Sequence, residues 1–357
     1  MKRSERTCEL LIMHCQNYPK LQIQDIFKFL YQSSFGCEHL VSDPETVTNY
    51  IQKEYESISG YKQPVVEQLD GAYCRVPLSY LKHGLSAHTL GKLFLASAKK
   101  ESKGKEDLIQ KLKVAKELVY EKRLPFSQDE YEKAMKEWEM KGYPAVRHSD
   151  VFRGAYQPSY RVIANEYIPF LPLFTELDKR LEKGTVKAAI EGGSASGKTT
   201  LSEILTAIYG CTVFHMDDFF LQPQQRTPER YAEAGGNIDR ERFLTEVLKP
   251  LCNGEVVNYR KFDCSTRKIM DAIQITPQRM SVIEGAYSMH PQLSGYYDLS
   301  VFLEISPELQ KERILRRNSP HIAEKFFNEW IPLEKIYFEK MKVKERCDIY
   351  IRVAKQS

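Results

Sequence analysis

The amino-acid sequence predicts an α/β fold with a parallel β-sheet in its C-terminal half, preceded by a mostly helical N-terminal half. Three observations lead to this fold class. After residue 184, short β-rich apolar runs alternate with helical segments, which is the pattern of strands joined by crossover helices. The first of these runs leads into a glycine-rich loop and an amphipathic helix. Before residue 184, apolar residues recur instead with near-helical spacing.

Length and composition agree with two globular domains. The chain has 357 residues, of which 42% are hydrophobic and 28% charged, and these values exclude a fibre or a disordered tail. Because domains commonly hold about 150 residues, we expect two, with a boundary near Gly184. The predicted domains are residues 1–184, of unknown function, and residues 185–357. The formal net charge is only +4, so electrostatics gives no case for a nucleic-acid partner.

Sequence features also predict a compartment. No stretch approaches the roughly 18 apolar residues of a membrane span, so no membrane partner is expected. The apolar run at residues 10–13 is far too short for a secretory signal. The eight cysteines are scattered without a C-x-x-C pair, which fits reduced thiols rather than a zinc or redox motif. We therefore expect a cytoplasmic protein.

Capping signals support the helices of the first half. Residues 21–31 carry a wide apolar face at helical spacing. Asp43 followed by Pro44 is typical of an N-cap and first helical position. Ser127 and Glu130 form a capping-box pattern before another helix. Two further segments are expected, namely a loop with an exposed helix over residues 99–122 and a helix over residues 172–184.

The second half is predicted to alternate strands and helices in order along the chain. Each strand is a short apolar run with many β-branched residues. The predicted strands cover residues 186–190, 212–215, 280–283, 299–305 and 348–353. The predicted helices cover residues 198–208, 240–248, 307–316 and 323–341.

The clearest motif joins the first strand to the first helix of this half. It matches G-x-x-x-x-G-K-[ST] at every fixed position, where glycines let backbone N–H groups face phosphate oxygens. Lys198 is expected to reach the β- and γ-phosphates, and Thr199 to place its hydroxyl on Mg²⁺. The nucleotide-binding residues are therefore predicted to be Gly192, Gly193, Ser194, Ala195, Ser196, Gly197, Lys198, Thr199 and Thr200.

Charged residues follow three later segments. Asp217 lies at the tip of the second strand, where ligands bind in α/β sheets, and could accept a proton from an attacking hydroxyl or cap a turn. Asp239 reads either as an N-cap or as a ligand for a substrate hydroxyl. Glu284 ends a strand and could hold Mg²⁺ directly or through water. Arg313 and Arg316 fit a lid over the phosphoryl group or a solvated basic face.

With these residues in order, residues 185–357 resemble uridine kinase and its relatives in the phosphoribulokinase/uridine kinase family. The string from Gly192 to Thr200 is similar almost letter for letter to the family's phosphate loop. The resemblance implies a P-loop sheet of the nucleoside and nucleoside-monophosphate kinase type, ATP or GTP, and Mg²⁺. It implies the following roles: catalysis by Asp217, Lys198, Arg313 and Arg316, metal binding by Thr199 and Glu284, and substrate binding by Asp239, Phe220, Tyr259 and Arg267.

Two departures separate this sequence from the nucleoside kinases of that family. Phe220 stands where a tyrosine would supply a hydroxyl. The substrate loop over residues 259–267 lacks the histidine that reads the base. Because a site built to hydrogen-bond a base loses discrimination without that group, kinase chemistry carries over better than uridine specificity.

The first half has no such resemblance, but it holds a set of polar and aromatic residues that serve either packing and capping or a second ligand site. This set comprises His39, Asp70, Arg75, His148, Arg153, Tyr156, Tyr160 and Arg161.

Together these features predict an ATP-dependent kinase that phosphorylates a hydroxyl of a small metabolite, either nucleoside-like or sugar-like. Two alternatives remain open at this point. One is a nucleotide-dependent switch or ATPase whose helical half binds a protein, and the other is a bifunctional enzyme. Assembly into an oligomer is compatible with the sequence.

Overall fold

The computed structural model describes residues 3–37, 43–58, 60, 63–100 and 102–354. The chain divides into two compact units, Met1–Ile168 and Pro169–Ser357. The sequence placed the boundary later, at residue 184. Helix α8 (Leu171–Lys183) accounts for the difference, because it packs on the first strand of the second unit.

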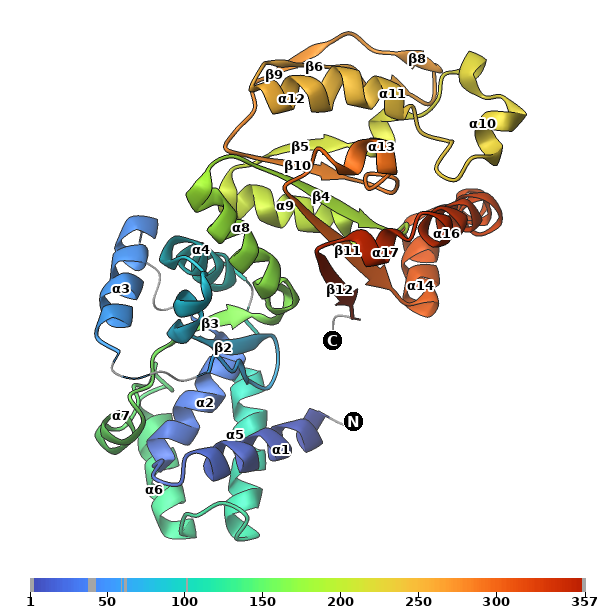
Figure 1. Cartoon of the computed structure of the whole chain (residues 1–357). Coiled ribbons are helices and arrows are strands. Elements are labelled where there is room, and N and C mark those ends of the chain that lie inside the picture. Colours follow the sequence, from blue (N-terminus) through green and yellow to red (C-terminus); the bar gives the residue numbers. More distant parts are fainter. Residues whose placement is uncertain (1–2, 38–42, 59, 61–62, 101, 355–357) are drawn as a thin grey trace. The chain divides into compact units, whose positions relative to one another are not determined.

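The first unit is mostly helical, as expected (Figure 1). Asp43 accepts a hydrogen bond from the backbone N–H of Thr46, and Ser127 and Glu130 form the predicted capping box. The helices are α1 (Arg3–Asn17), α2 (Ile23–Phe35), α3 (Pro44–Glu56), η2 (Leu78–His83), α4 (Ala87–Ala98), α5 (Gly104–Tyr120), α6 (Gln128–Met140) and α7 (Asp150–Tyr156), and η3 (Asn165–Phe170) spans the division between the units.

Helix α5 differs from the exposed helix expected there. Leu108, Leu112 and Ala115 on one of its faces are fully buried. Lys111 is buried as well, and its ammonium pairs with Asp107 at 2.9 Å. The many lysines and glutamates therefore mark the solvent side of an amphipathic helix that belongs to the core.

A small antiparallel sheet in the first unit escaped the sequence analysis. Strand β2 (Tyr73–Pro77) pairs with β1 (Glu67–Gln68) on one side and with β3 (Tyr160–Ala164) on the other. Arg75 lies in the middle of β2 and is buried, which breaks the usual alternation of apolar and polar residues. This buried arginine becomes important below.

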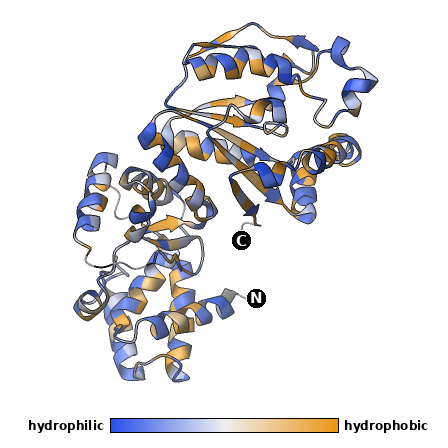
Figure 2. Ribbon diagram, viewed as in Figure 1, coloured by the Kyte–Doolittle hydropathy of each residue, from blue (hydrophilic) through white to orange (hydrophobic). Residues whose placement is uncertain are grey.

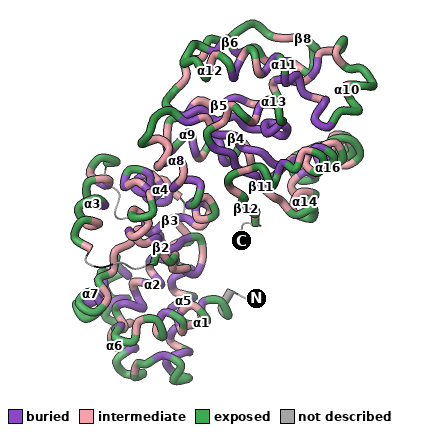
Figure 3. The backbone as a smooth tube through the Cα atoms, viewed as in Figure 1, coloured by how far each residue is buried: buried purple, intermediate pink, exposed green. Residues whose placement is uncertain are grey.

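The second unit contains a five-stranded sheet in the order β12-β11-β4-β10-β5, with every neighbouring pair parallel. The central strands are buried along their length (Figure 3). All five predicted strands are present, as β4 (Val186–Gly192), β5 (Thr212–His215), β10 (Met280–Glu284), β11 (Leu299–Ile305) and β12 (Ile349–Val353). The α/β fold class is confirmed.

The core lies on both faces of this sheet, and its strands stand out as hydrophobic in Figure 2. Ala189, Phe214, Ile283 and Phe302 belong to one cluster with apolar side chains of the segments that follow β5 and β10. Their neighbours along each strand point to the opposite face because side chains alternate. Helices α8 and α9 pack against β4.

Short strands and helices complete the second unit. Two antiparallel pairs lie outside the main sheet, β6 (Val257–Tyr259) with β9 (Ile273–Ile275) and β7 (Phe262–Asp263) with β8 (Lys268–Ile269). The remaining helices are α9 (Lys198–Tyr209), η4 (Met216–Phe219), η5 (Pro223–Gln225), α10 (Pro228–Ala232), α11 (Arg240–Phe243), η6 (Leu244–Leu248), α12 (Lys249–Asn253), α13 (Pro291–Ser294), α14 (Pro307–Arg317), α15 (Pro320–Lys325), η7 (Phe326–Trp330), α16 (Ile331–Lys340) and α17 (Val343–Arg346).

Two of the predicted helices contain a π-helical segment. Segment η6 runs over Leu244–Leu248 and η7 over Phe326–Trp330. In both, a proline stands two residues beyond the segment, at Pro250 and Pro332. Proline has no N–H to donate and its ring clashes with the carbonyl four residues back, so the regular i→i−4 ladder cannot continue.

Across the described ranges, none of the helices combines the length and apolar character required of a membrane-spanning segment.

Candidate nucleotide and acceptor site

The loop between β4 and α9 has the backbone of a phosphate cradle. Gly192 has φ 150° and Gly197 has φ 97°, backbone conformations that residues other than glycine rarely adopt. A Cβ atom on Gly192 would lie 2.6 Å from the carbonyl oxygen of Leu303. The glycines are therefore required by the path of the loop, which brings the N-terminus of α9 to its open side.

Polar groups of this loop have hydrogen-bonding capacity that an anion could use. The Lys198 ammonium donates to the carbonyl oxygens of Gly192 and Gly193, at 2.8 and 3.1 Å. The Ser196 hydroxyl is buried and has no hydrogen-bond partner among the described residues. A chain of phosphates would satisfy these donors together with the loop amides, so the residues present fit a nucleoside triphosphate.

Side chains from later helices hold the loop from its other side. The Glu334 carboxylate on α16 accepts from the backbone N–H of Ser194 at 2.9 Å and from its hydroxyl at 2.6 Å. On α14, Gln310 donates to the Ser194 carbonyl and Arg313 to the Ala195 carbonyl, at 2.8 and 3.0 Å. The structure thus places Arg313, one of the residues singled out from the sequence, at the loop, together with Glu334 and Gln310, which were not.

Hard oxygen ligands for a cation meet beside the loop. The Thr199 hydroxyl donates to a Glu284 carboxylate oxygen at 3.2 Å, and His215 Nδ1 lies 2.7 Å from the same oxygen. That hydrogen bond raises the pKa of His215. The described residues contain no cluster of three or more histidine, cysteine or acidic side chains suited to a metal. One hydroxyl and one carboxylate fit Mg²⁺, which is usually held by few protein ligands together with phosphates and water.

A cleft of about 940 Å³ opens next to the phosphate loop. Its lining includes Ser194 of the loop and three residues predicted for catalysis or substrate binding, Asp217, Phe220 and Arg267. The sequence analysis did not predict several other lining residues, among them Arg226, Tyr231, Asn237, Cys264, Tyr287, Phe326, Glu329 and Trp330. These residues are single arginines and aromatic residues in loops and at a π-helical segment. They belong to no sequence motif, so the sequence gives no sign of their place in the cleft.

Asp217 is exposed and lines this cleft. Surrounding protein displaces much of its water and raises its pKa, an effect that Lys198 opposes and that Glu284 and Asp218 reinforce. A carboxylate in this position can hydrogen-bond an incoming hydroxyl and take its proton.

Asp239, Tyr259 and Arg316 are not among the residues that line the cleft. Asp239 is buried and accepts from the backbone N–H of Arg242, so it is the N-cap of α11. Tyr259 is also buried, and its hydroxyl donates to Asp218 at 2.7 Å. Arg316 is exposed on α14. Of the segment that contains Asp239, Asn237 is the residue that lines the cleft.

Most of the polar residues noted in the first half have structural partners. Asp70 accepts from Thr7, His148 bonds Asp25 at 2.9 Å, and Arg161 pairs with Glu54 at 2.8 Å. Arg153 pairs with Asp150 on the surface. His39 lies outside the described residues. Arg75, Tyr156 and Tyr160 also have partners, and in addition they line one cavity.

The parallel sheet, the glycine cradle and the adjacent cleft define the second unit as a P-loop kinase fold. Residues 188–321 match the model of the Phosphoribulokinase / Uridine kinase family, and the predicted resemblance is thereby confirmed. The matched range contains none of the first 184 residues.

Curated relatives agree with this family. A uridine kinase of Chlamydia pneumoniae is 29% identical over 137 residues, which are 36% of this chain and 60% of that protein. A uridine kinase of Staphylococcus aureus (strain JH9) is 29% identical over 145 residues, 38% of this chain and 68% of that protein. The chain thus spans less than two thirds of the length of the Chlamydia protein.

Two solved structures are also similar to the chain. One, of a possible uridine kinase from Bacillus stearothermophilus, has a TM-score of 0.37 and 22% identity, covering 49% of this chain and 99% of that one. Shikimate kinase from Acinetobacter baumannii has a TM-score of 0.30 and 18% identity, covering 50% of this chain and 88% of that one.

Proposed function

We propose that the protein is an ATP-dependent kinase that transfers the γ-phosphoryl group to a hydroxyl of a small metabolite, nucleoside-like or sugar-like. One observation carries this proposal: Asp217 and Ser194 of the phosphate loop line the same cleft. A candidate base and a phosphate cradle that share one cleft can bring an acceptor hydroxyl in line with a phosphoryl group.

The residues at the phosphate loop and Asp217 then each have a definite task. The loop amides, Lys198 and Ser196 hold the phosphates, and Thr199 and Glu284 would hold Mg²⁺, which neutralises charge on the phosphoryl oxygens when bound. Asp217 orients the acceptor hydroxyl and receives its proton as the new P–O bond forms. Arg313, which already contacts the loop, stabilises the charge of the transferring group.

The composition of the cleft supports a ring-bearing acceptor. Phe220, Tyr231 and Trp330 supply flat apolar surface, whereas Arg226 and Arg267 supply hydrogen-bond donors. We assign these side chains to substrate binding in preference to the buried Asp239 and Tyr259. Asn237 takes the role of a hydroxyl ligand that the sequence analysis gave to Asp239.

We further propose that the enzyme works in a reducing, cytoplasmic compartment with GTP as a second candidate donor. In the part of the chain that the structure describes, all eight cysteines are reduced. Disulfides are rare in reducing compartments, where such thiols persist.

A phosphoryl-transfer screen tests the proposed activity. Purified protein with ATP and Mg²⁺ is incubated with nucleosides, sugars and hydroxy acids, and formation of ADP and of a phosphorylated product is followed by mass spectrometry. We expect at least one acceptor to be phosphorylated by the native protein and not by Lys198→Ala, because loss of this ammonium removes charge stabilisation at the phosphates. ATP turnover without any phosphorylated acceptor would overturn the proposal.

A further inference from the structure

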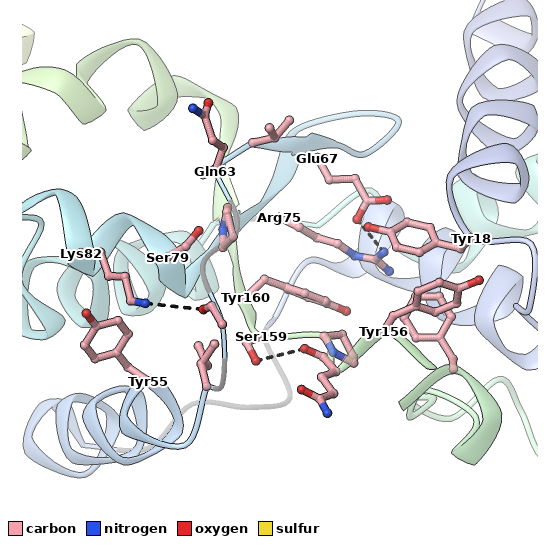
Figure 4. A pocket seen from close by; sticks show the side chains of 17 residues that line it. Tyr18, Tyr55, Gln63, Glu67, Arg75, Ser79, Lys82, Tyr156, Ser159 and Tyr160 are labelled. Carbon is pink, nitrogen blue, oxygen red and sulfur yellow. Dashed lines mark hydrogen bonds and ion pairs between the residues drawn. The ribbon is translucent and has the colours of Figure 1, made fainter. Parts of the chain in front are cut away.

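The first unit contains a cavity of about 260 Å³, and none of its lining residues belongs to the candidate kinase site. Its aromatic wall comes from separate segments, with Tyr18 just after α1, Phe152 and Tyr156 on α7, and Tyr160 at the start of β3. Figure 4 shows Tyr18, Tyr156 and Tyr160 around the end of the Arg75 side chain. The chain therefore gathers aromatic rings around a cation at a site of its own.

Arg75 is held rigidly but is incompletely satisfied. Its side chain is only 2% exposed. Its Nε donates to Gln32 and its Nη1 to Glu67, both at 2.9 Å, and its guanidinium lies 4.8 Å from the centre of the Tyr160 ring. Its Nη2 is buried without a hydrogen-bond partner among the described residues. Because buried donors are almost always paired, this free N–H group indicates a missing acceptor.

A second unsatisfied group lines the same cavity. The hydroxyl of Ser79 is buried and also has no partner within the described part of the chain. Ser79 lies on η2, directly after the strand that carries Arg75. Two unpaired polar groups in a cavity that is also lined by aromatic rings are the composition of a small-molecule site.

The charges around Arg75 select the kind of acceptor. Burial by itself would raise the pKa of Glu67, but the charge of Arg75 and the hydrogen bond with His14 have the larger combined effect and lower this pKa to about 2. Glu67 therefore stays a carboxylate and neutralises Arg75. Burial lowers the pKa of both His14 and His148, which keeps these rings uncharged. An anion placed here would lie close to the Glu67 carboxylate, whereas a neutral carbonyl oxygen would not be repelled.

We propose that the first unit binds a small, flat, uncharged ring compound that presents a carbonyl oxygen to Arg75 and a second polar atom to Ser79, as a pyrimidine base does. The ring stacks against the tyrosines, which offer flat surfaces with little loss of side-chain freedom. The cavity has room for one such ring and its substituents. This site is separate from the cleft of the second unit, and the proposal does not depend on the kinase activity.

Calorimetric titration of the full chain tests this site. The probes are uracil, cytosine and thymine, each of which carries a ring carbonyl, with benzoate as a charged flat ring and glucose as a non-planar control. We expect at least one nucleobase to bind more tightly than benzoate, and glucose not to bind. Absence of binding by all three nucleobases, or tighter binding of benzoate, would overturn the proposal.

Variants locate the binding. Arg75→Lys keeps the charge but loses the second Nη donor, and Ser79→Leu fills the cavity from a half-exposed position. Each should weaken nucleobase binding at least tenfold while circular dichroism stays native, and if Arg75→Lys does not fold, Ser79→Leu decides. Arg267→Ala, in the cleft of the second unit, is the matched control and should leave this binding unchanged. Binding that survives Ser79→Leu but is lost in Arg267→Ala would assign the ligand to the kinase cleft and reject the proposed site.

Discussion

Replacing Asp217 with asparagine is the most direct test of the proposed chemistry. Asparagine has nearly the same shape but cannot take a proton from the acceptor hydroxyl. Asp217 lines the acceptor cleft and does not hold the phosphate loop, whose contacts come from Glu334, Gln310 and Arg313. We therefore expect Asp217→Asn to bind ATP almost as tightly as the native protein does.

The expected loss in transfer follows from the surroundings of this carboxylate. A positioned general base contributes about 10² to 10⁴ in rate. Because Asp217 is exposed to the cleft, water can take part of its place, which favours the lower end of that range. A hundredfold loss corresponds to about 2.7 kcal/mol in activation free energy. We expect Asp217→Asn to lower kcat at least a hundredfold.

The pH dependence gives a second, independent signature. The pKa of Asp217 is raised, and only the deprotonated form can act as a base. The rate of the native protein should therefore fall as the pH drops through this raised pKa, whereas the residual rate of Asp217→Asn should lack that fall.

Steady-state kinetics measures kcat and its pH dependence, and an ATP titration measures the affinity for ATP. Asp218→Asn is the matched control, because Asp218 is adjacent in sequence but accepts a hydrogen bond from Tyr259 and does not line the cleft. The control should retain more than a tenth of native activity. Full activity in Asp217→Asn, or an equal loss in Asp218→Asn, would refute the assignment of the base.

Other predictions follow from single contacts. Gly192→Ala should lower the free energy of unfolding by about 1–3 kcal/mol, and more than Gly184→Ala, which has a similar φ but open space around its Cβ; equal losses in urea titrations would contradict this. Glu334→Ala frees the amide and hydroxyl of Ser194 and removes a negative charge, so calorimetry should show ATP binding about fivefold tighter, or ~1 kcal/mol, and weaker binding would speak against it. Hydrogen bonds from His148 and Ser149 outweigh burial and lower the pKa of Asp25 from its ordinary 3.8 to about 2, so the stability it gives is present above pH 3.8 and lost as the pH falls toward 2. Unfolding free energies measured from pH 2 to 4 should therefore change by about 2 kcal/mol more in the native protein than in Asp25→Asn, and parallel curves would exclude this role.

The sheet of the second unit could be predicted because each strand carries its own signal. Parallel strands are buried on both faces and appear as continuous apolar runs, such as residues 299–305. The phosphate loop could be predicted for a similar reason, since its chemistry depends on residue types at fixed, local spacing. In both cases the information lies within about ten residues of sequence.

The parts that could not be predicted depend on contacts between distant segments. Glu334 reaches Ser194 across 140 positions in the sequence, and nothing in its neighbourhood differs from an ordinary helix residue. Strand β2 pairs with β3 far along the chain, and the buried Arg75 interrupts its apolar pattern. Asp239 shows a different limit, because an N-cap and a substrate ligand require the same residue type, and only the structure shows the cap.

The π-helical segment η7 fixes the angular position of everything that follows it in the helix. Each added residue turns an α-helix by about 100°, so one residue accommodated in a wider turn rotates the next stretch by that amount. Pro332 interrupts the i→i−4 hydrogen bonds and thus sets the direction in which the Glu334 side chain points from α16. In this direction Glu334 contacts the phosphate loop at Ser194. If Phe326–Trp330 instead formed a regular α-helix of the same length, Glu334 would be turned by about 100° and would no longer point at Ser194.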